Sequence, residues 1–278
     1  MKRLLVFMML LLAGCIINEP QEYTIRNDGV EGKFVEKEMS VYEGSDLEIV
    51  TEYNNEGKYS EPYGKAVIYG YDESIVSFEN EGYAEESIPK LGAKSKQSPG
   101  GYDTLIFEGA AELEHGDEYN TNLVLGTCYH YKTRVTDEIC VGRESCRKGT
   151  LEPKEQGGPI SISEIQYETI GDNVEVVVTV ENKGDGKVIA PATSAYEACP
   201  FNLEEEHQNK ATIEMEINGM QKENCDEQAV ELYQNSGKTQ CTFSGDLEET
   251  SEFTTQVMVE ADYNYLSKDT MRLSVLGD

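Results

Sequence analysis

The cysteines and the acidic residues are the side chains whose types could carry chemistry in this chain of 278 residues. Six of the seven cysteines lie beyond the N-terminal segment, at Cys128, Cys140, Cys146, Cys199, Cys225 and Cys241. No two of them have the C-x-x-C spacing of a structural zinc site, and the three histidines, at 115, 130 and 207, are scattered. An even number of well-separated cysteines is typical of disulfide bonds in an oxidising compartment. We therefore predict that these six form disulfides and that none of them is a metal ligand.

Local spacing suggests which of these cysteines pair. Cys128 and Cys140 flank a segment that reads as a hairpin, and Cys225 and Cys241 flank another, whose turn is Asn235-Ser236-Gly237. The remaining pair would be Cys146 with Cys199. Pairing Cys140 with Cys146 is the main alternative, and the sequence leaves it open.

Calcium is the cofactor that the acidic loops could hold, because Ca²⁺ prefers oxygen ligands. Asp185, in the turn Lys183-Gly184-Asp185-Gly186, and the run Glu204-Glu205-Glu206 are the candidates. No D-x-D-x-D-G loop occurs, and a chain with 53 Asp and Glu residues contains acidic clusters by chance. We interpret these groups as solvated surface charge and His130 as a structural residue, and we predict no cofactor.

No pattern of residues indicates catalysis. The G-x-S-x-G, Walker and Rossmann glycine motifs do not occur, and no pair of carboxylates stands out as a glycosidase dyad. Tyr129 alternates with Tyr131, and Tyr263 with Tyr265, as on two strands. Such rows could stack on sugars, but in a β-sandwich they more often form cross-strand pairs or cap the core, which is our prediction. We predict that the chain is not an enzyme.

The first fifteen residues, MKRLLVFMMLLLAGC, begin with Lys2 and Arg3 and continue as an apolar run too short to span a bilayer. The run ends in Leu-Ala-Gly-Cys, which resembles the lipobox of prokaryotic lipoproteins. The resemblance implies a signal peptide over residues 1–14, cleavage before Cys15, and lipidation of Cys15. We expect an exported protein, anchored in the cell membrane through this N-terminal lipid and facing the extracellular side.

The net charge limits the classes of molecule that the protein can bind. Against 53 acidic residues stand 23 Lys and Arg, a formal net charge of -30. Because this field repels phosphate, nucleic acid is excluded as a partner of the protein as a whole. A membrane through the lipid, and a protein or glycan on the cell surface, remain as expected partners.

The rest of the chain is organised as short segments of alternating polarity, separated by turn residues. Residues 15–32 lack periodicity and are expected to form a flexible tether after the lipidated cysteine. Strands are expected at 47–53, 64–71, 102–107 and 122–133, and 79–101 are expected to be a long loop. A charged linker at 147–159 precedes further strands, which include alternating valines at 174, 176, 178 and 180 and end with two strands at 254–265 and 270–277. No amphipathic helix of convincing length appears.

Two motifs resemble a known family. The segment EVVVTVENKGDGKV (175–188) is similar to a strand–turn–strand signature of CARDB-like, immunoglobulin-like domains on prokaryotic and often archaeal cell surfaces. The run CYHYKTRVTDEICV (128–141), followed by GGPISISEIQYE (157–168), is similar to two-domain archaeal surface proteins. The resemblance implies structural, spacer or adhesive modules without a catalytic motif.

The expectation for the whole chain is an all-β protein with two tandem immunoglobulin-like β-sandwich domains, at 33–150 and 157–278. Its expected role is that of a non-enzymatic surface lipoprotein with a structural, adhesive or partner-binding function. The alternative is an extracellular lipoprotein that captures a solute or glycan, and an envelope hydrolase ranks last.

Overall fold

The computed structural model describes residues 22–277, except 61, 81, 113–117, 143–144, 155, 227 and 246–251. The predicted signal peptide and Cys15 therefore lie outside the described residues. The described part is built almost entirely from antiparallel strands, which confirms the all-β prediction. Its helices are the short α2 (Thr193–Ala198) and the 3-10 turn η1 (Glu205–His207). Among the described residues, no helix is long and apolar enough to cross a bilayer.

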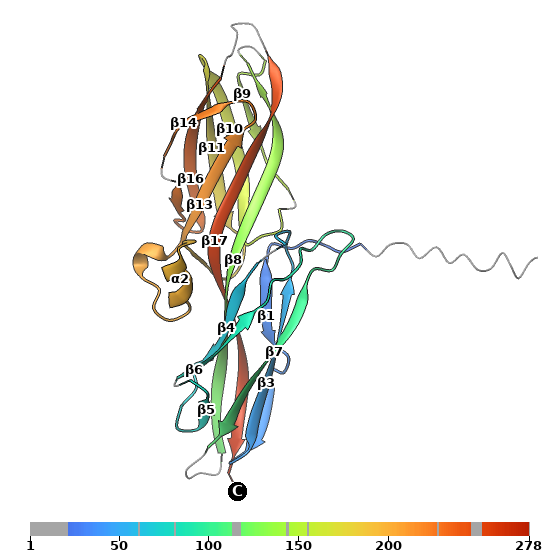
Figure 1. The fold of residues 1–278 in the computed structure, drawn as a ribbon, viewed down its shortest axis with the longest axis vertical. Helices are drawn as coiled ribbons and strands as arrows, with labels where there is room; N and C mark the ends of the chain where they lie inside the picture. Colours follow the sequence, from blue (N-terminus) through green and yellow to red (C-terminus); the bar gives the residue numbers. More distant parts are fainter. Residues whose placement is uncertain are drawn as a thin grey trace, which may run out of the picture.

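Two strands of 24 residues each, β8 (Glu118–Val141) and β17 (Phe253–Leu276), pair antiparallel over their whole length. At about 3.3 Å per residue this ribbon is ~80 Å long, and it runs through the elongated molecule from one end to the other (Figure 1). Residues of odd number along β17, such as Val257, Tyr263 and Leu273, are buried on one face, which we call the inner face. The opposite side is the outer face.

The ribbon corrects two expectations. Residues 128–140 are continuous strand rather than a hairpin, and 254–265 and 270–277 belong to one strand rather than two. The polar stretch Ser267-Lys268-Asp269 does not interrupt β17, because β8 continues to pair with it on one side. Strand pairing at a distance therefore outweighs the local polarity that suggested a break.

One small sheet packs on the inner face of the ribbon at the lower end in Figure 1. It contains, in order, β1 (Val30–Phe34), β3 (Asp46–Asn55), β7 (Tyr102–Ala111) and β5 (Val76–Phe78). Beside the ribbon at this end lie β4 (Gly64–Tyr69), β6 (Tyr83–Ile88) and β2 (Glu38–Tyr42), the last parallel to β17. Strand β6 lies within 79–101, so that segment is not entirely loop.

A second small sheet packs on the inner face at the upper end. It contains, in order, β14 (Gln221–Cys225), β16 (Ser236–Ser244), β11 (Asn173–Asn182), β10 (Ile160–Ile170) and β9 (Lys148–Leu151). The ribbon is extended there by β13 (Lys210–Ile217), β15 (Ala229–Glu231) and β12 (Lys187–Ile189). The alternating valines of β11 are all buried, as their period-two spacing indicates.

Strand pairing crosses the boundary that the sequence suggested between residues 33–150 and 157–278. Residues 265–276, placed in the second domain from the sequence, pair with residues 118–129 and, from Arg272 onward, with β2. The expected tether also ends earlier, because Val30–Phe34 is strand β1 and the Arg26 amide donates to the Glu56 carbonyl at 3.1 Å. Buried residues of both ends form one continuous hydrophobic cluster. The shared ribbon is the reason, since each of its strands contributes to both ends.

Candidate functional site

The six cysteines beyond Cys15 are all disulfide-bonded, in a pattern that differs in part from the preferred prediction. The bonds join Cys128 to Cys199, Cys140 to Cys146, and Cys225 to Cys241. The predicted Cys225–Cys241 bond is present, and the two residues face each other across β14 and β16. The predicted Cys128–Cys140 and Cys146–Cys199 bonds are wrong, and the alternative Cys140–Cys146 bond is present.

The length of β8 explains the error. Cys128 and Cys140 are twelve positions apart on one extended strand, which corresponds to about 40 Å, whereas the Cα atoms of a disulfide lie within about 7 Å. Cys128 instead meets Cys199, just after α2, with a Cα–Cα distance of 6.3 Å. This bond holds α2 against the outer face of the ribbon, where Leu266 and Ala195 are buried beside it.

The two groups of acidic residues considered as calcium ligands do not lie together. Glu204 and Glu206 lie near His207, with its Nε2 3.7 Å from Glu206 Oε1, and both glutamate side chains are about 70% exposed. Asp185 is not part of this group and instead lines a cleft described below. The turn that carries Asp185 connects two different sheets, because it leads from β11 in the upper small sheet to β12 beside the ribbon.

The tyrosines predicted to form cross-strand pairs do so, at the middle of the ribbon, which we call the waist. Tyr129 lies opposite Tyr265 and Tyr131 opposite Tyr263, with ring centroids 5.6 and 6.2 Å apart. All four rings are buried on the inner face, in the hydrophobic cluster that also contains core residues of both small sheets. They are therefore core residues and not an exposed platform for sugars.

The hydroxyl groups of these tyrosines bind main-chain atoms of the loops that cover the waist. Tyr129 donates to the Asp28 carbonyl at 2.9 Å and Tyr131 to the Gly157 carbonyl at 3.0 Å. The Gly186 amide donates to the Tyr265 hydroxyl at 2.7 Å. Burial raises the pKa of Tyr265 to about 12 and holds the pKa values of Tyr129 and Tyr263 well above their ordinary value. Hydrogen bonds of these uncharged tyrosine hydroxyls therefore hold loops from both halves of the chain against the waist.

The outer face of the same strands carries charges. His130 Nε2 lies 2.7 Å from Asp262 Oδ1, and Lys132 Nζ lies 2.7 Å from Glu260 Oε1. Arg134 Nε donates to Glu260 Oε2 at 2.8 Å. Burial by itself would raise the pKa of Glu260, but the hydrogen bonds from Lys132 and Arg134 outweigh it and hold this pKa below its ordinary value. His130 also stacks on Tyr63, with ring centroids 5.1 Å apart.

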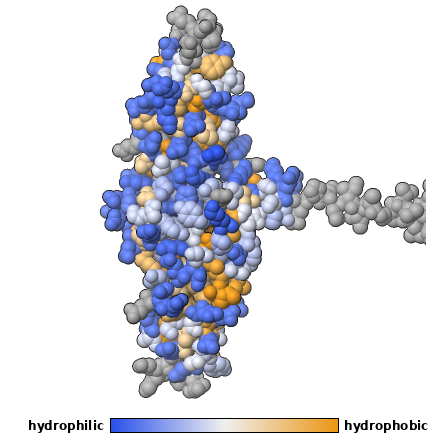
Figure 2. All heavy atoms as spheres, in the orientation of Figure 1, coloured by the Kyte–Doolittle hydropathy of each residue, from blue (hydrophilic) through white to orange (hydrophobic). Residues whose placement is uncertain are grey.

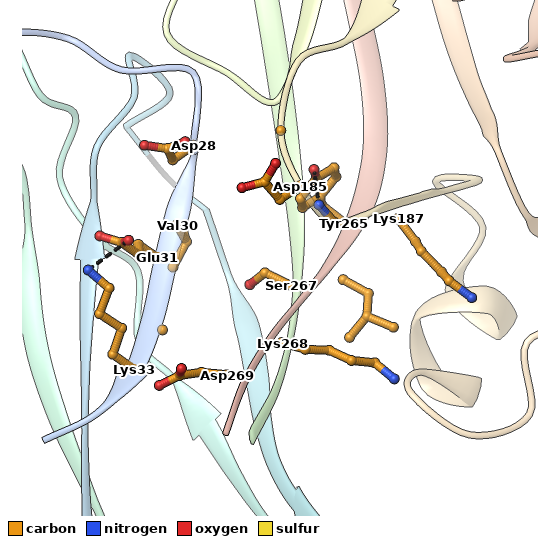
Figure 3. A pocket seen from close by; sticks show the side chains of 14 residues that line it. Asp28, Val30, Glu31, Lys33, Asp185, Lys187, Tyr265, Ser267, Lys268 and Asp269 are labelled. Atoms are coloured by element: carbon orange, nitrogen blue, oxygen red, sulfur yellow. Dashed lines mark hydrogen bonds and ion pairs between the residues drawn. The ribbon is translucent and has the colours of Figure 1, made fainter. Parts of the chain in front are cut away.

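A cleft of about 440 Å³ opens at the waist between β1, β17 and the turn before β12. Figure 3 shows Asp28 and Asp185 at one end of this cleft, and Glu31 paired with Lys33 on β1. Ser267, Lys268 and Asp269 line it from β17. Its size lies in the range of ligand sites in proteins. The cleft was not foreseen from the sequence, because its walls come from three segments that are far apart along the chain.

Comparisons with known proteins add little to this description. No protein-family model matches the chain, and no curated protein matches it. Among solved structures, one match is titled "AvmM Catalyzes Macrocyclization in Alchivemycin A Biosynthesis". It is 16% identical, with a TM-score of 0.21, over 39% of this chain and 80% of that one. A TM-score this low is insufficient to transfer either a fold or an activity.

Proposed function

We propose that the chain is a non-enzymatic lipoprotein of the cell surface, anchored through Cys15, with a structural, adhesive or partner-binding role. The observation that carries this proposal is the disulfide bonding of all six cysteines beyond Cys15. Bonds of this kind persist in exported proteins and are rare in reducing compartments. The lipobox-like sequence that ends at Cys15 supplies the anchor in this proposal.

The architecture supports a role in display. The shared ribbon and the buried tyrosines join the two ends of the molecule into one elongated body, and a continuous core is expected to hold it stiff (Figure 1). We propose that each end is an immunoglobulin-like sandwich of the CARDB-like kind, modified by the ribbon that they share. Hydrophilic side chains cover most of the face seen in Figure 2, as suits a protein surrounded by water.

The test is the intact mass of the protein extracted from membranes, measured with and without reduction. The expected mass is that of a chain beginning at Cys15 with a diacylglyceryl group, and reduction adds six hydrogens for three disulfides. The control is the Cys15→Ser variant, which should lose both the lipid and the membrane association. An unlipidated native chain with free thiols would refute the proposal.

Capture of a solute or glycan is the second candidate, and the cleft at the waist favours it. The cleft offers charged side chains and the edge of a sheet rather than an exposed aromatic surface, since Tyr265 on its wall is only 2% exposed. Sugar-binding sites commonly stack aromatic rings on the ligand. Within this second candidate, the cleft therefore favours a peptide as the captured solute over a glycan.

A further inference from the structure

The long strand β17 has one uncovered stretch. One of its edges pairs with β8 throughout. The other edge pairs with β13 at residues 257–262, with β12 at 264–266 and with β2 at 272–276. Among the described residues, no strand pairs with this edge between Leu266 and Arg272. The stretch 267–271, which we call the open edge, is therefore bounded at both ends by existing partner strands.

The main chain of the open edge has hydrogen-bonding groups that face outward. The Arg272 amide donates to the Lys37 carbonyl at 2.9 Å, on the side away from β8. Because main-chain groups alternate in direction along a strand, those of Lys268 and Thr270 face the same side. Both residues are exposed. Unpaired main-chain groups at a strand edge are a template for another extended chain.

The cleft at the waist lies directly beside the open edge, and a second strand edge lines its other wall. Strand β1 is the last strand of its sheet, so one of its edges is unpaired. The Phe34 amide, on that edge, donates to Asp269 Oδ2 of β17 at 2.9 Å, and alternation places the main chain of Gly32 on the same side. Gly32 and Ser267 both line the cleft. Two strand edges therefore border one cleft.

Buried hydroxyls beneath the cleft add polar groups without partners. Thr127 lies opposite Ser267 in the ribbon, and its side chain is buried against Gly32. Neither Thr127 Oγ1 nor Ser267 Oγ has a hydrogen-bond partner among the described residues. Leaving such groups unsatisfied costs free energy, and both oxygen atoms are enclosed beneath the cleft rather than open to it.

The charges of the cleft favour a cationic occupant. Asp28 and Asp185 lie at one end, and both act electrostatically on the Tyr265 hydroxyl. Asp28 is paired with Arg26, whose Nε lies 3.2 Å from Asp28 Oδ2, whereas Asp185 has no ion pair among the described residues. The nearby lysines do not neutralise Asp185: Lys268 extends away over the Tyr69 ring, 5.5 Å from its centroid, and Lys187 also points away. The chain as a whole carries a net charge of -30, which attracts positive partners over a longer range.

We propose that the cleft binds an extended segment of a partner protein that carries a positively charged side chain, and that this segment adds to β17 as a strand between β12 and β2. The main chain of the segment pairs with Lys268 and Thr270, and its cationic side chain pairs with Asp185, near the Arg26–Asp28 ion pair. Strand addition of this kind takes affinity from main-chain hydrogen bonds and specificity from side chains. The proposal deepens the partner-binding role proposed above and rests on it.

The test uses the full chain in detergent and a fluorescein-labelled heptapeptide of alternating threonine and valine with a lysine at one end. The matched control peptide has the same sequence but is N-methylated at alternate residues, so that it cannot donate the main-chain hydrogen bonds. We expect saturable binding of the first peptide and at least about tenfold weaker binding of the second. Hydrogen exchange at the Lys268 and Thr270 amides should slow by at least about tenfold in the complex.

Charge variants test the orientation of the peptide. The double variant Asp28→Asn and Asp185→Asn should weaken binding about three- to tenfold, whereas the matched variant Glu204→Gln and Glu206→Gln, at an exposed site outside the cleft, should leave it unchanged. Equal binding of the methylated peptide, or protection of amides elsewhere, overturns the proposal. The proposal is also overturned if self-association of the chain, or binding of its own residues 16–21 in the cleft, blocks the peptide. The mass measurement above decides lipid anchoring independently, so failure of the two proposals can be told apart.

Discussion

The two faces of the ribbon at the waist use the same pair of strands for opposite chemistry. On the inner face, four tyrosine rings are buried and their hydroxyls bind main-chain atoms of loops from both halves. The side chain that follows each tyrosine points to the outer face. There, Lys132 and Arg134 both pair with Glu260. Because side chains alternate along a strand, a shift of one residue separates the core from the charged surface. The inner face is expected to supply most of the stability.

The largest expected effect is on the inner face. Tyr131→Ala should lower the free energy of unfolding by about 3–5 kcal/mol, because it removes a fully buried ring together with its hydrogen bonds. Urea unfolding followed by circular dichroism measures the change. The matched control is Tyr233→Ala, at a tyrosine that is 78% exposed, with an expected change within about 0.5 kcal/mol. A loss below about 1 kcal/mol for Tyr131→Ala would contradict the comparison.

The second-largest loss of stability is expected from removal of the Cys128–Cys199 disulfide on the outer face. Replacing Cys128 and Cys199 together by serine opens a loop of 71 residues, and loop-closure entropy predicts a loss of about 4 kcal/mol. The same replacement of Cys140 and Cys146, six residues apart, should cost only about 2 kcal/mol. Urea midpoints of the two double variants make the test. Equal losses would show that the Cys128–Cys199 bond constrains the unfolded chain less than its span implies.

Alkaline pH tests the inner face without a mutation. The pKa of Tyr265 rises from 10.0 to about 12 on folding, so the folded protein keeps a proton that the unfolded chain releases. This stabilisation is complete below pH 10 and is lost as the pH rises from 10 to about 12, at a cost of about 2–3 kcal/mol for this group. Stability should be measured against pH, with Tyr265→Phe as the control whose slope is shallower. Ionisation of all tyrosines near pH 10 with the fold intact would argue against burial of these rings.

The smallest effect is expected from the charges of the outer face. Glu260→Gln should lower the free energy of unfolding by only about 1 kcal/mol, because Lys132 and Arg134 remain partly exposed and can be hydrated. The loss should shrink in 1 M salt, which screens exposed charges. The control is Glu204→Gln, whose carboxylate is exposed, with no measurable change expected. A loss as large as that of Tyr131→Ala would remove the distinction between the two faces.

The sequence by itself determined the local features of this protein. Period-two alternation predicted strands at 47–53 and over the valines of β11, and the structure buries Leu47, Ile49 and these valines. It also predicted the cross-strand pairing of the tyrosines and the Cys225–Cys241 bond. These features could be predicted because each depends on the polarity of neighbouring residues or on a short separation along the chain.

The tertiary structure alone decided how the strands continue and meet. Residues 118–141 pair with 253–276 across more than a hundred residues, and no local signal encodes that register or its length. The Cys128–Cys199 bond and the cleft beside the open edge follow from this ribbon, because both join segments that only the ribbon brings together. Local polarity fixes which face of a strand is buried, whereas burial against two sheets at once fixes how far the strand extends.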